Sequence, residues 1–206
     1  MPKPSPSRNR QILTWGILVI AITVPVFAAA MSPYLAWRQP IYIAAGFAGI
    51  AAMVLLLLQP LLVGGYLPGL EGPKGKRFHR MVGLVLVVAV VVHVGGLWIT
   101  SPPDVIDALT FNSPTPFSAW GVIAMWAVFG AALWASVRRR LGAQTGRWRL
   151  GHTLLAVIVV VSSVVHALLI EGTMETISKV ALCALALLAM AKVVFELKAW
   201  AAKSRS

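Results

Sequence analysis

Two stretches decide the fold of this 206-residue chain: RFHRMVGLVLVVAVVVHVGGLWI at residues 77–99 and RLGHTLLAVIVVVSSVVHALLI at residues 149–170. Each contains an apolar run long enough, at a rise of about 1.5 Å per residue, to cross the hydrocarbon core of a bilayer as a helix. The whole chain is 59% hydrophobic and 12% charged, which is unlike a soluble domain. Six spans are predicted: Ile12–Ala30, Ile41–Val63, Met81–Ile99, Ala119–Val137, Leu150–Ile170 and Ile177–Phe195. We therefore expect an all-α integral membrane protein, a six-helix bundle.

The spans use nearly the whole chain. We expect a cytoplasmic tail at residues 1–11, one six-helix transmembrane domain at 12–197 and a cytoplasmic tail at 198–206. The small residues at 28–30 also fit the cleavage site of a signal peptide, but the preceding apolar run is longer than a signal peptide needs, which favours a membrane span. The longest outer loop, residues 101–117, is expected to carry a short surface helix at 104–109 and to be the docking surface for an outer partner.

The formal charge of +12 is distributed by loop. Except for Arg38 and Lys179, every Lys and Arg falls before the first span, between spans two and three, between spans four and five, or in the last span and the tail after it. The positive-inside rule makes that side cytoplasmic and places both termini inside. We expect a protein of a bacterial inner membrane, because no targeting signal is evident. Its basic charge then reflects topology and not binding of nucleic acid, and the spans are expected to contact membrane lipid.

All four histidines of the chain lie in spans three and five. His79 and His93 are fourteen residues apart, and so are His152 and His166. Fourteen residues of helix leave an offset of about 40° and a rise of about 21 Å, so each pair lies on one face of its helix. One span separates these two helices, so they run parallel. Packed face to face, they would set His79 opposite His152 and His93 opposite His166, making two stacked bis-histidine sites.

Such sites suit two b-type haems, whose iron takes an imidazole on each face. The haems would lie between the third and fifth spans, and sites about 20 Å apart suit electron transfer between leaflets. The single cysteine, Cys183, leaves no C-x-x-C-H motif for covalent attachment. Zinc is disfavoured because its ligands must converge on one point. A proton relay is disfavoured because the acidic residues lie in loops or near helix ends. The competing interpretation is structural: His93 and His166 would form interhelical hydrogen bonds, and the other two would be wetted loop residues.

Other candidate residues have plainer explanations beside the functional one. Arg77, Arg80, Arg147 and Arg149 are candidates for binding haem propionates through charge-assisted hydrogen bonds, although the positive-inside rule already accounts for them. Trp126, near the middle of span four, is a candidate aromatic group between the two haems, although core packing explains such a residue too.

The paired histidines, together with Arg77-Phe78-His79-Arg80 and the segment from Arg147 to His152, resemble the ferric reductase-like transmembrane domain. This is the haem-bearing core of ferric reductases, NADPH oxidases and the bacterial haem subunit of periplasmic methionine sulfoxide reductase. The likeness covers about residues 42–195. It implies that these histidines hold haem b, and that electrons pass from the cytoplasm to an acceptor outside.

The chain departs from the larger members of that family. About ten residues follow the last span, and no G-x-G-x-x-G motif opens a nucleotide-binding unit. The chain is therefore expected to be an oxidoreductase subunit without its own flavin or nicotinamide domain; whether it is itself an enzyme stays open. The sulfoxide reductase subunit often lacks one histidine of the set, which argues against that assignment here.

The resemblance implies partners on both sides of the membrane. The expected donor is a cytoplasmic reductase or a quinol, with flavin or quinone supplied by or shared with that partner. The expected acceptor is a periplasmic protein, a ferric chelate or oxygen, reached near Glu171 or the 101–117 loop. Two alternatives remain: a quinol-oxidising b-type cytochrome, and a non-enzymatic membrane transporter or assembly protein whose histidines are structural.

Overall fold

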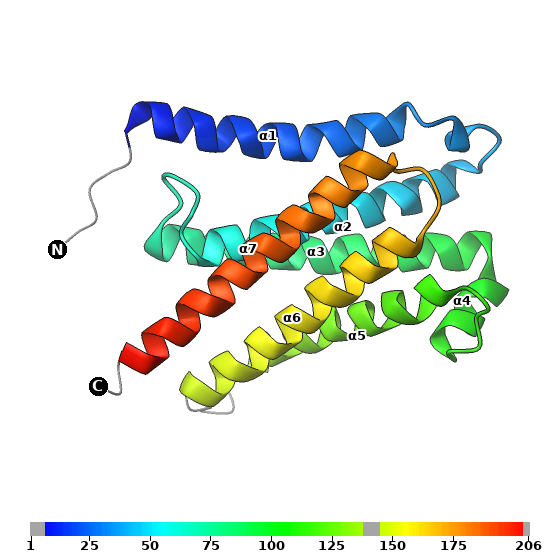
Figure 1. Cartoon of the computed structure of the whole chain (residues 1–206). Helices are drawn as coiled ribbons and strands as arrows, with labels where there is room; N and C mark the ends of the chain where they lie inside the picture. The colour runs from blue at the N-terminus through cyan, green and yellow to red at the C-terminus, as the bar shows by residue number, and fades with distance from the viewer. Residues whose placement is uncertain (1–6, 138–144, 204–206) are drawn as a thin grey trace.

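A computed structural model describes residues 7–137 and 145–203, and the described residues are helical without any strand (Figure 1). Six of the helices are long and apolar enough to cross a membrane, which confirms the predicted all-α six-helix bundle. The helices are α1 (Arg8–Ala30), the 3-10 helix η1 (Pro33–Leu35), α2 (Pro40–Val63), α3 (Gly72–Thr100), α4 (Pro102–Leu109), α5 (Pro116–Val137), α6 (Thr145–Leu169) and α7 (Thr176–Lys203). The short α4 is the helix expected in the longest loop.

The two histidine-bearing helices begin earlier than the apolar pattern predicts. The third span was predicted from Met81, but α3 begins at Gly72, with a proline in its first turn. Proline fits there because the first turn has no partner for its missing N–H. Basic residues do not interrupt the helix, since their long side chains reach out of the bilayer. His79 and His152 therefore lie within helices and not in loops.

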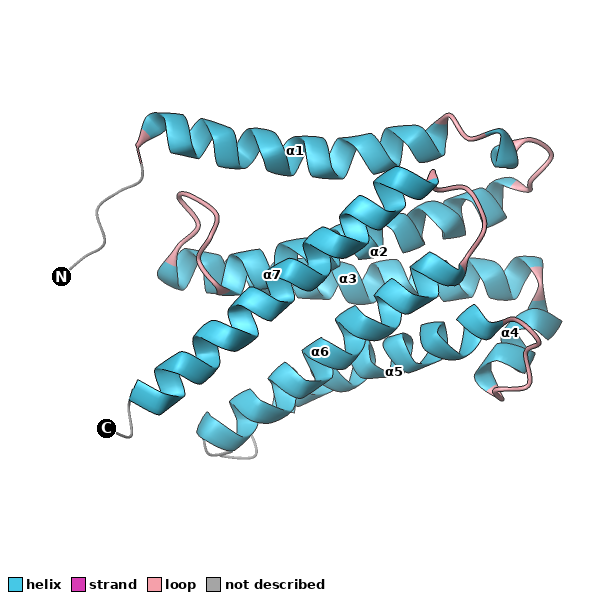
Figure 2. Ribbon diagram, in the orientation of Figure 1, coloured by secondary structure: helices cyan, strands magenta, loops and turns pink. Residues whose placement is uncertain are grey.

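Two antiparallel hairpins, α2–α3 and α5–α6, pack in the same way (Figure 2). Small residues let their helices approach closely. A Cβ on Gly96 of α3 would lie 2.8 Å from Cβ of Ala45 on α2, and one on Gly151 of α6 would lie 3.1 Å from the indole of Trp134 on α5. Close approach of this kind is typical of membrane helices. It fixes which residues of α2 and α5 can reach the histidines.

Helix α7 crosses the two hairpins and closes the core. Leu182 and Ala186 of α7 are almost fully buried, together with Val160 of α6 and Leu57 of α2. By contrast, α3 buries just Gly75 and Leu86 among its residues. Helix α1 contacts α7 and α2 and exposes most of its apolar side chains. These exposed faces meet lipid in a membrane.

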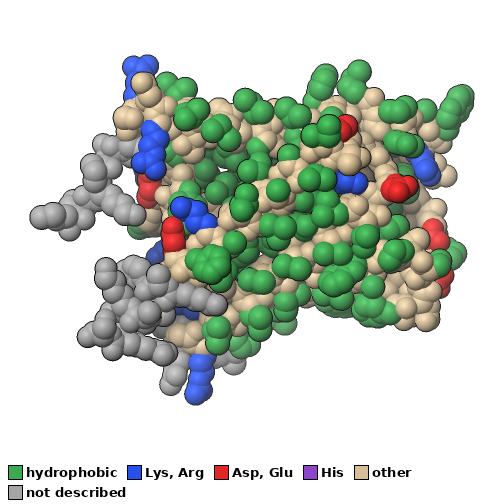
Figure 3. All heavy atoms as spheres, viewed as in Figure 1, with side chains coloured by type: hydrophobic (Ala, Val, Ile, Leu, Met, Phe, Trp, Pro, Cys, Tyr) green, Lys and Arg blue, Asp and Glu red, His purple; other side chains and the backbone are tan. Residues whose placement is uncertain are grey.

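Charged side chains gather at the two ends of the bundle, and apolar side chains cover its middle (Figure 3). The start of α1 and the end of α7 lie at one end (Figure 1), which we call the inner end. The starts of α3 and α6 lie there too, with the basic residues of their first turns. Arg138, Arg139 and Arg140, which the sequence also assigns to this side, lie outside the described residues. The bundle thus has the polarity of a multi-pass membrane protein.

Candidate functional site

The structure brings the four histidines together as two pairs across the space between α3 and α6. At the inner end, the ring centres of His79 and His152 are 6.2 Å apart, with an angle of 80° between the ring planes. Towards the outer end, the ring centres of His93 and His166 are 6.4 Å apart, with an angle of 81°. The two pairs have nearly the same geometry. These are the pairs that the spacing of fourteen predicts.

In the outer pair, a backbone carbonyl of a neighbouring helix fixes each ring. Nδ1 of His93 lies 2.7 Å from the carbonyl oxygen of Ala45 on α2. Nδ1 of His166 lies 2.8 Å from the carbonyl oxygen of Phe117 on α5. A carbonyl can only accept, so Nδ1 is the donor in each ring, and in the neutral imidazole Nε2 then keeps its lone pair. Each ring then presents an unprotonated nitrogen, the form that binds a metal.

A glycine makes room for each outer ring. Gly49 lies four residues after Ala45 on α2, and a Cβ there would lie 3.0 Å from Nδ1 of His93. Gly121 lies four residues after Phe117 on α5, and a Cβ there would lie 2.7 Å from the ring of His166. Real Cβ atoms essentially never lie as close as the 2.7 Å at Gly121, and the 3.0 Å at Gly49 is tighter than nine in ten real Cβ contacts. Both glycines are therefore part of the outer site, although the sequence analysis did not identify them.

The inner pair has the same kind of support. Nδ1 of His79 lies 3.3 Å from the carbonyl oxygen of Gln59 on α2. Nδ1 of His152 is buried and lies against the backbone of Ala131 on α5, but the contact falls short of hydrogen-bond geometry. The ring of Trp148 stacks on that of His152, with ring centres 5.3 Å apart and an angle of 8°. His152 is thus held by stacking as well as by the neighbouring backbone.

The supporting residues repeat the spacing of the histidines. Ala45 and Gln59 are fourteen residues apart on α2, and Phe117 and Ala131 are fourteen apart on α5. Helix α2 therefore offers a backbone carbonyl to both histidines of α3, whereas α5 offers one to His166 and a backbone contact without a hydrogen bond to His152. The sequence did not reveal these backbone contacts to the histidines, because any residue type can supply a backbone carbonyl.

The arrangement suits a metal ion held between two imidazoles. With metal–nitrogen bonds of about 2 Å and ring nitrogens about 1 Å from the ring centres, the centres of two such rings lie about 6 Å apart. Both pairs have nearly this separation. Among the described residues, no group of three or more His, Cys, Asp or Glu side chains lies together, so the donor set is two imidazoles for each site. A planar iron macrocycle supplies the remaining ligands itself, and the donors fit haem.

Two apolar residues occupy the level midway between the pairs. Leu86 lies seven residues from each histidine of α3, and Val159 lies seven residues from each histidine of α6. They are 7% and 4% exposed and belong to the same core cluster. The two sites are therefore separated by packed aliphatic side chains.

The remaining predicted residues make no described hydrogen bond or ring contact with the histidines. Arg77, Arg80, Arg147 and Arg149 are exposed at the inner end and form no ion pair with a described residue. Trp126 is 58% exposed, and its ring contact is with Phe129 of its own helix, at 6.0 Å. The structure does not bring Trp126 into contact with a histidine ring.

A pair of tryptophans joins α5 and α6 at the inner end. Nε1 of Trp134 donates to the carbonyl oxygen of Trp148, and Nε1 of Trp148 donates to the carbonyl oxygen of Trp134, both at 3.2 Å. Trp148 precedes His152 by four residues, one helical turn, so the two share a face. The spacing of four residues from His152 could have identified Trp148 as a neighbour of the inner site from the sequence alone.

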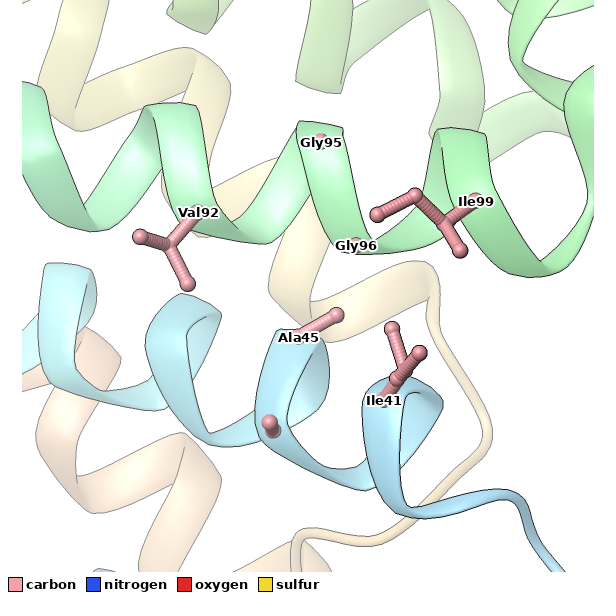
Figure 4. A pocket seen from close by; sticks show the side chains of 7 residues that line it. Ile41, Ala45, Val92, Gly95, Gly96 and Ile99 are labelled. Carbon is pink, nitrogen blue, oxygen red and sulfur yellow. The ribbon is translucent and has the colours of Figure 1, made fainter.

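An apolar groove lies beside the outer site, between α2 and α3 (Figure 4). Its volume is about 340 Å³, and it is lined by Ile41, Ala44, Ala45, Val92, Gly95, Gly96 and Ile99. It contains no ionisable side chain, so it offers no chemistry of its own. It is distinct from the space between the paired histidines.

Comparison with known families agrees with this geometry. A family model described as "Ferric reductase like transmembrane component" matches residues 45–163, more than half of the chain. The match includes His79, His93 and His152 and the backbone acceptors on α2 and α5. No curated protein and no solved structure matched the chain. With its paired histidines on the third and fifth spans, the chain belongs to the family of ferric reductase like transmembrane components.

Proposed function

We propose that this protein carries electrons across the membrane through two haems b, one held by His79 and His152 and the other by His93 and His166. The observation that carries the proposal is the pairing of rings at 6.2 and 6.4 Å with Nδ1 directed at a neighbouring backbone. Family membership supports transmembrane electron transfer in general. Haem bound at each pair would supply one-electron redox chemistry.

The protein's own residues orient the ligands and exclude water. The carbonyls of Ala45 and Phe117 hold the outer rings so that Nε2 is free to bind iron. Leu86 and Val159 keep the space between the sites dry. The exposed Arg77, Arg80, Arg147 and Arg149 are positioned at the inner end, where they would pair with the propionates of the inner haem. Trp126 contacts none of the histidine rings, so the proposal does not rely on the prediction that it lies between the two haems.

The charge distribution supports an orientation. The inner end would face the cytoplasm, with both termini there, in a bacterial inner membrane. Electrons would enter from a cytoplasmic reductase or a quinol, with flavin or quinone brought by that partner. They would leave to a periplasmic protein, a ferric chelate or oxygen. Under this proposal the chain is the haem subunit of an oxidoreductase.

The structural interpretation of the histidines has one observation in its favour. Each Nδ1 of the outer pair already makes an interhelical hydrogen bond, which alone would stabilise a membrane bundle. It does not explain why the same rings oppose one another in two equal pairs. The haem content of the protein distinguishes the two interpretations.

The test is a reduced-minus-oxidised visible spectrum with pyridine haemochrome quantitation on purified protein. The wild type is expected to contain two haems b per chain, and His93→Ala and His166→Ala are each expected to retain one. Ring planes at 80° and 81° also predict strongly anisotropic low-spin ferric signals in electron paramagnetic resonance. Parallel rings would give an ordinary rhombic signal.

Leu84→Ala is the matched control, because Leu84 lies on the same helix as His93 and is 67% exposed. It should keep both haems. A colourless wild type produced with ample haem would overturn the proposal and leave the structural interpretation. Quinone analogues that inhibit reduction would identify a quinol as the donor.

A further inference from the structure

One charged side chain lies buried towards the outer end of the bundle. Lys179, in the first turn of α7, is 7% exposed, and among the residues whose side chains the structure describes no other Lys, Arg, Asp or Glu is buried. A charged group within a membrane span is costly and rare, and usually has a function. The positive-inside rule does not explain it, because the other described basic residues gather at the inner end, except for the exposed Arg38.

The Lys179 ammonium has a backbone partner and no carboxylate. Nζ donates to the carbonyl oxygen of Ile170 at 2.7 Å, and no described carboxylate lies within ion-pair distance. The neighbouring acid, Glu175, uses its two carboxylate oxygens to accept from the backbone N–H groups of Ile177 and Ser178. The positive charge is therefore not neutralised by a side chain. Its acceptor lies at the negative end of the α6 dipole, which favours a cation, whereas the first turn of α7, which carries Lys179, is the positive end of its own helix.

The acceptor of Lys179 places the charge on the outer side of His166, at the end of α6. Ile170 follows the last residue of α6 and lies four residues beyond His166, one helical turn further outward. Lys179 thus ties α7 to the end of the helix that carries His166. The basic residues at the inner end are exposed, and water and salt screen their charges; a buried charge is screened much less.

Building on the proposed haem sites, we infer that the buried ammonium of Lys179 raises the reduction potential of the outer haem and so draws electrons outward. Reduction adds negative charge at the iron, and a nearby positive charge in a poorly screened environment stabilises the reduced form. The step moves one electron: the inner iron is oxidised from ferrous to ferric as the outer iron is reduced from ferric to ferrous. Lys179 gives up no proton and forms no bond to the haem.

The experiment compares Lys179→Met and Lys179→Gln, which remove the charge, with Lys179→Arg, which keeps it. Both haems are titrated by absorbance in purified protein, and the outer component is assigned by its absence from His93→Ala. At an effective dielectric constant of about 20, a unit charge about 10 Å away changes a redox equilibrium roughly tenfold. We expect the Met and Gln variants to lower the outer midpoint potential by about 59 mV, the one-electron equivalent of tenfold. The inner midpoint should not move, and Lys179→Arg should titrate like the wild type.

Arg38→Met is the matched control at the same end of the bundle. Arg38 is exposed and lies over the ring of Tyr42, so its removal should leave both potentials unchanged.

If the wild type holds two haems and the Met and Gln variants titrate identically to it, this inference is wrong while the proposed function stands. If the Met and Gln variants lose the outer haem, the Arg variant decides. If Lys179→Arg keeps the haem content and the outer midpoint potential of the wild type, the role of the charge is supported. If all three variants lose the outer haem, Lys179 is a purely structural cap of α6 and the inference is wrong. A wild type without haem would instead remove the proposed function itself.

Discussion

The outer histidines each occupy a space that a glycine leaves on a neighbouring helix. The ring of His166 lies where a Cβ of Gly121 would approach to 2.7 Å, and that of His93 lies where a Cβ of Gly49 would approach to 3.0 Å. The hydrogen-bond acceptor of each ring lies one turn away on the same helix. The orientation of the imidazoles thus depends on backbone acceptors and on the lack of a side chain at the two glycines. A single methyl group added at either glycine should therefore disturb the site.

Gly121→Ala tests this dependence. The added methyl must displace the His166 ring or push α5 from α6, a form of overpacking that costs about 1–3 kcal/mol. We expect Gly121→Ala to lose the outer haem and keep the inner one, as measured by haem content per chain. Gly49→Ala should have a smaller effect, because its contact is longer.

Gly46→Ala and Gly95→Ala provide the comparison, since a Cβ at either position meets no atom within 4 Å. Both lie on the hairpin that contributes His93 to the outer site. Full haem occupancy in Gly121→Ala, or an equal loss in Gly46→Ala, would contradict the role assigned to the glycine.

At the scale of the helices, the hairpins α2–α3 and α5–α6 are two versions of one unit. Each has a second helix with histidines fourteen residues apart and a first helix with supporting backbone positions fourteen apart. The unit explains why both sites have similar ring separations. Helix α7 then joins the units, and its first turn is attached to the end of α6 through Lys179.

The start of α7 depends on Glu175, and this predicts an acid sensitivity. Backbone hydrogen bonds from Ser178 and Ile177 lower the pKa of Glu175 below its ordinary value. A carboxyl whose pKa is lower in the folded protein stabilises the fold above its ordinary pKa, and that contribution is lost as the pH falls through the lowered value. We expect the thermal midpoint in detergent to fall with acidification in this range, and Glu175→Gln to show a smaller fall from a lower starting value.

Glu171→Gln is the control, because Glu171 is exposed in the same loop and makes no described hydrogen bond. It should follow the wild-type profile. If Glu175→Gln matched the wild type at every pH, the carboxylate would not be the cap that anchors α7.

For the whole molecule, periodicity determined what the sequence could predict. Apolar runs predicted six spans, and equal spacing on two parallel helices predicted which histidines meet. The early start of α3 at Gly72 was not predicted, because basic residues and glycines carry no apolar signal. The acceptors of the ring nitrogens were missed because they are backbone atoms. The burial of Lys179 depends on how α7 packs across α6, and this packing cannot be predicted from the local sequence.

If each histidine pair holds a haem as proposed, the two haems lie at different depths in the membrane, and electron transfer across it should require both. The levels of the two pairs differ by about 21 Å along the helices, and a hydrocarbon core is about 30 Å thick. Neither site alone reaches both surfaces.

We expect proteoliposomes of the wild type to pass electrons from external dithionite to enclosed ferricyanide, with valinomycin and potassium relieving the charge imbalance. His79→Ala and His93→Ala should each slow this transfer by at least about tenfold, because one missing haem leaves most of the core thickness uncrossed. Leu84→Ala should transfer at the wild-type rate, and a wild-type rate in either histidine variant would mean that a single site suffices and that the stacked arrangement is not the electron path.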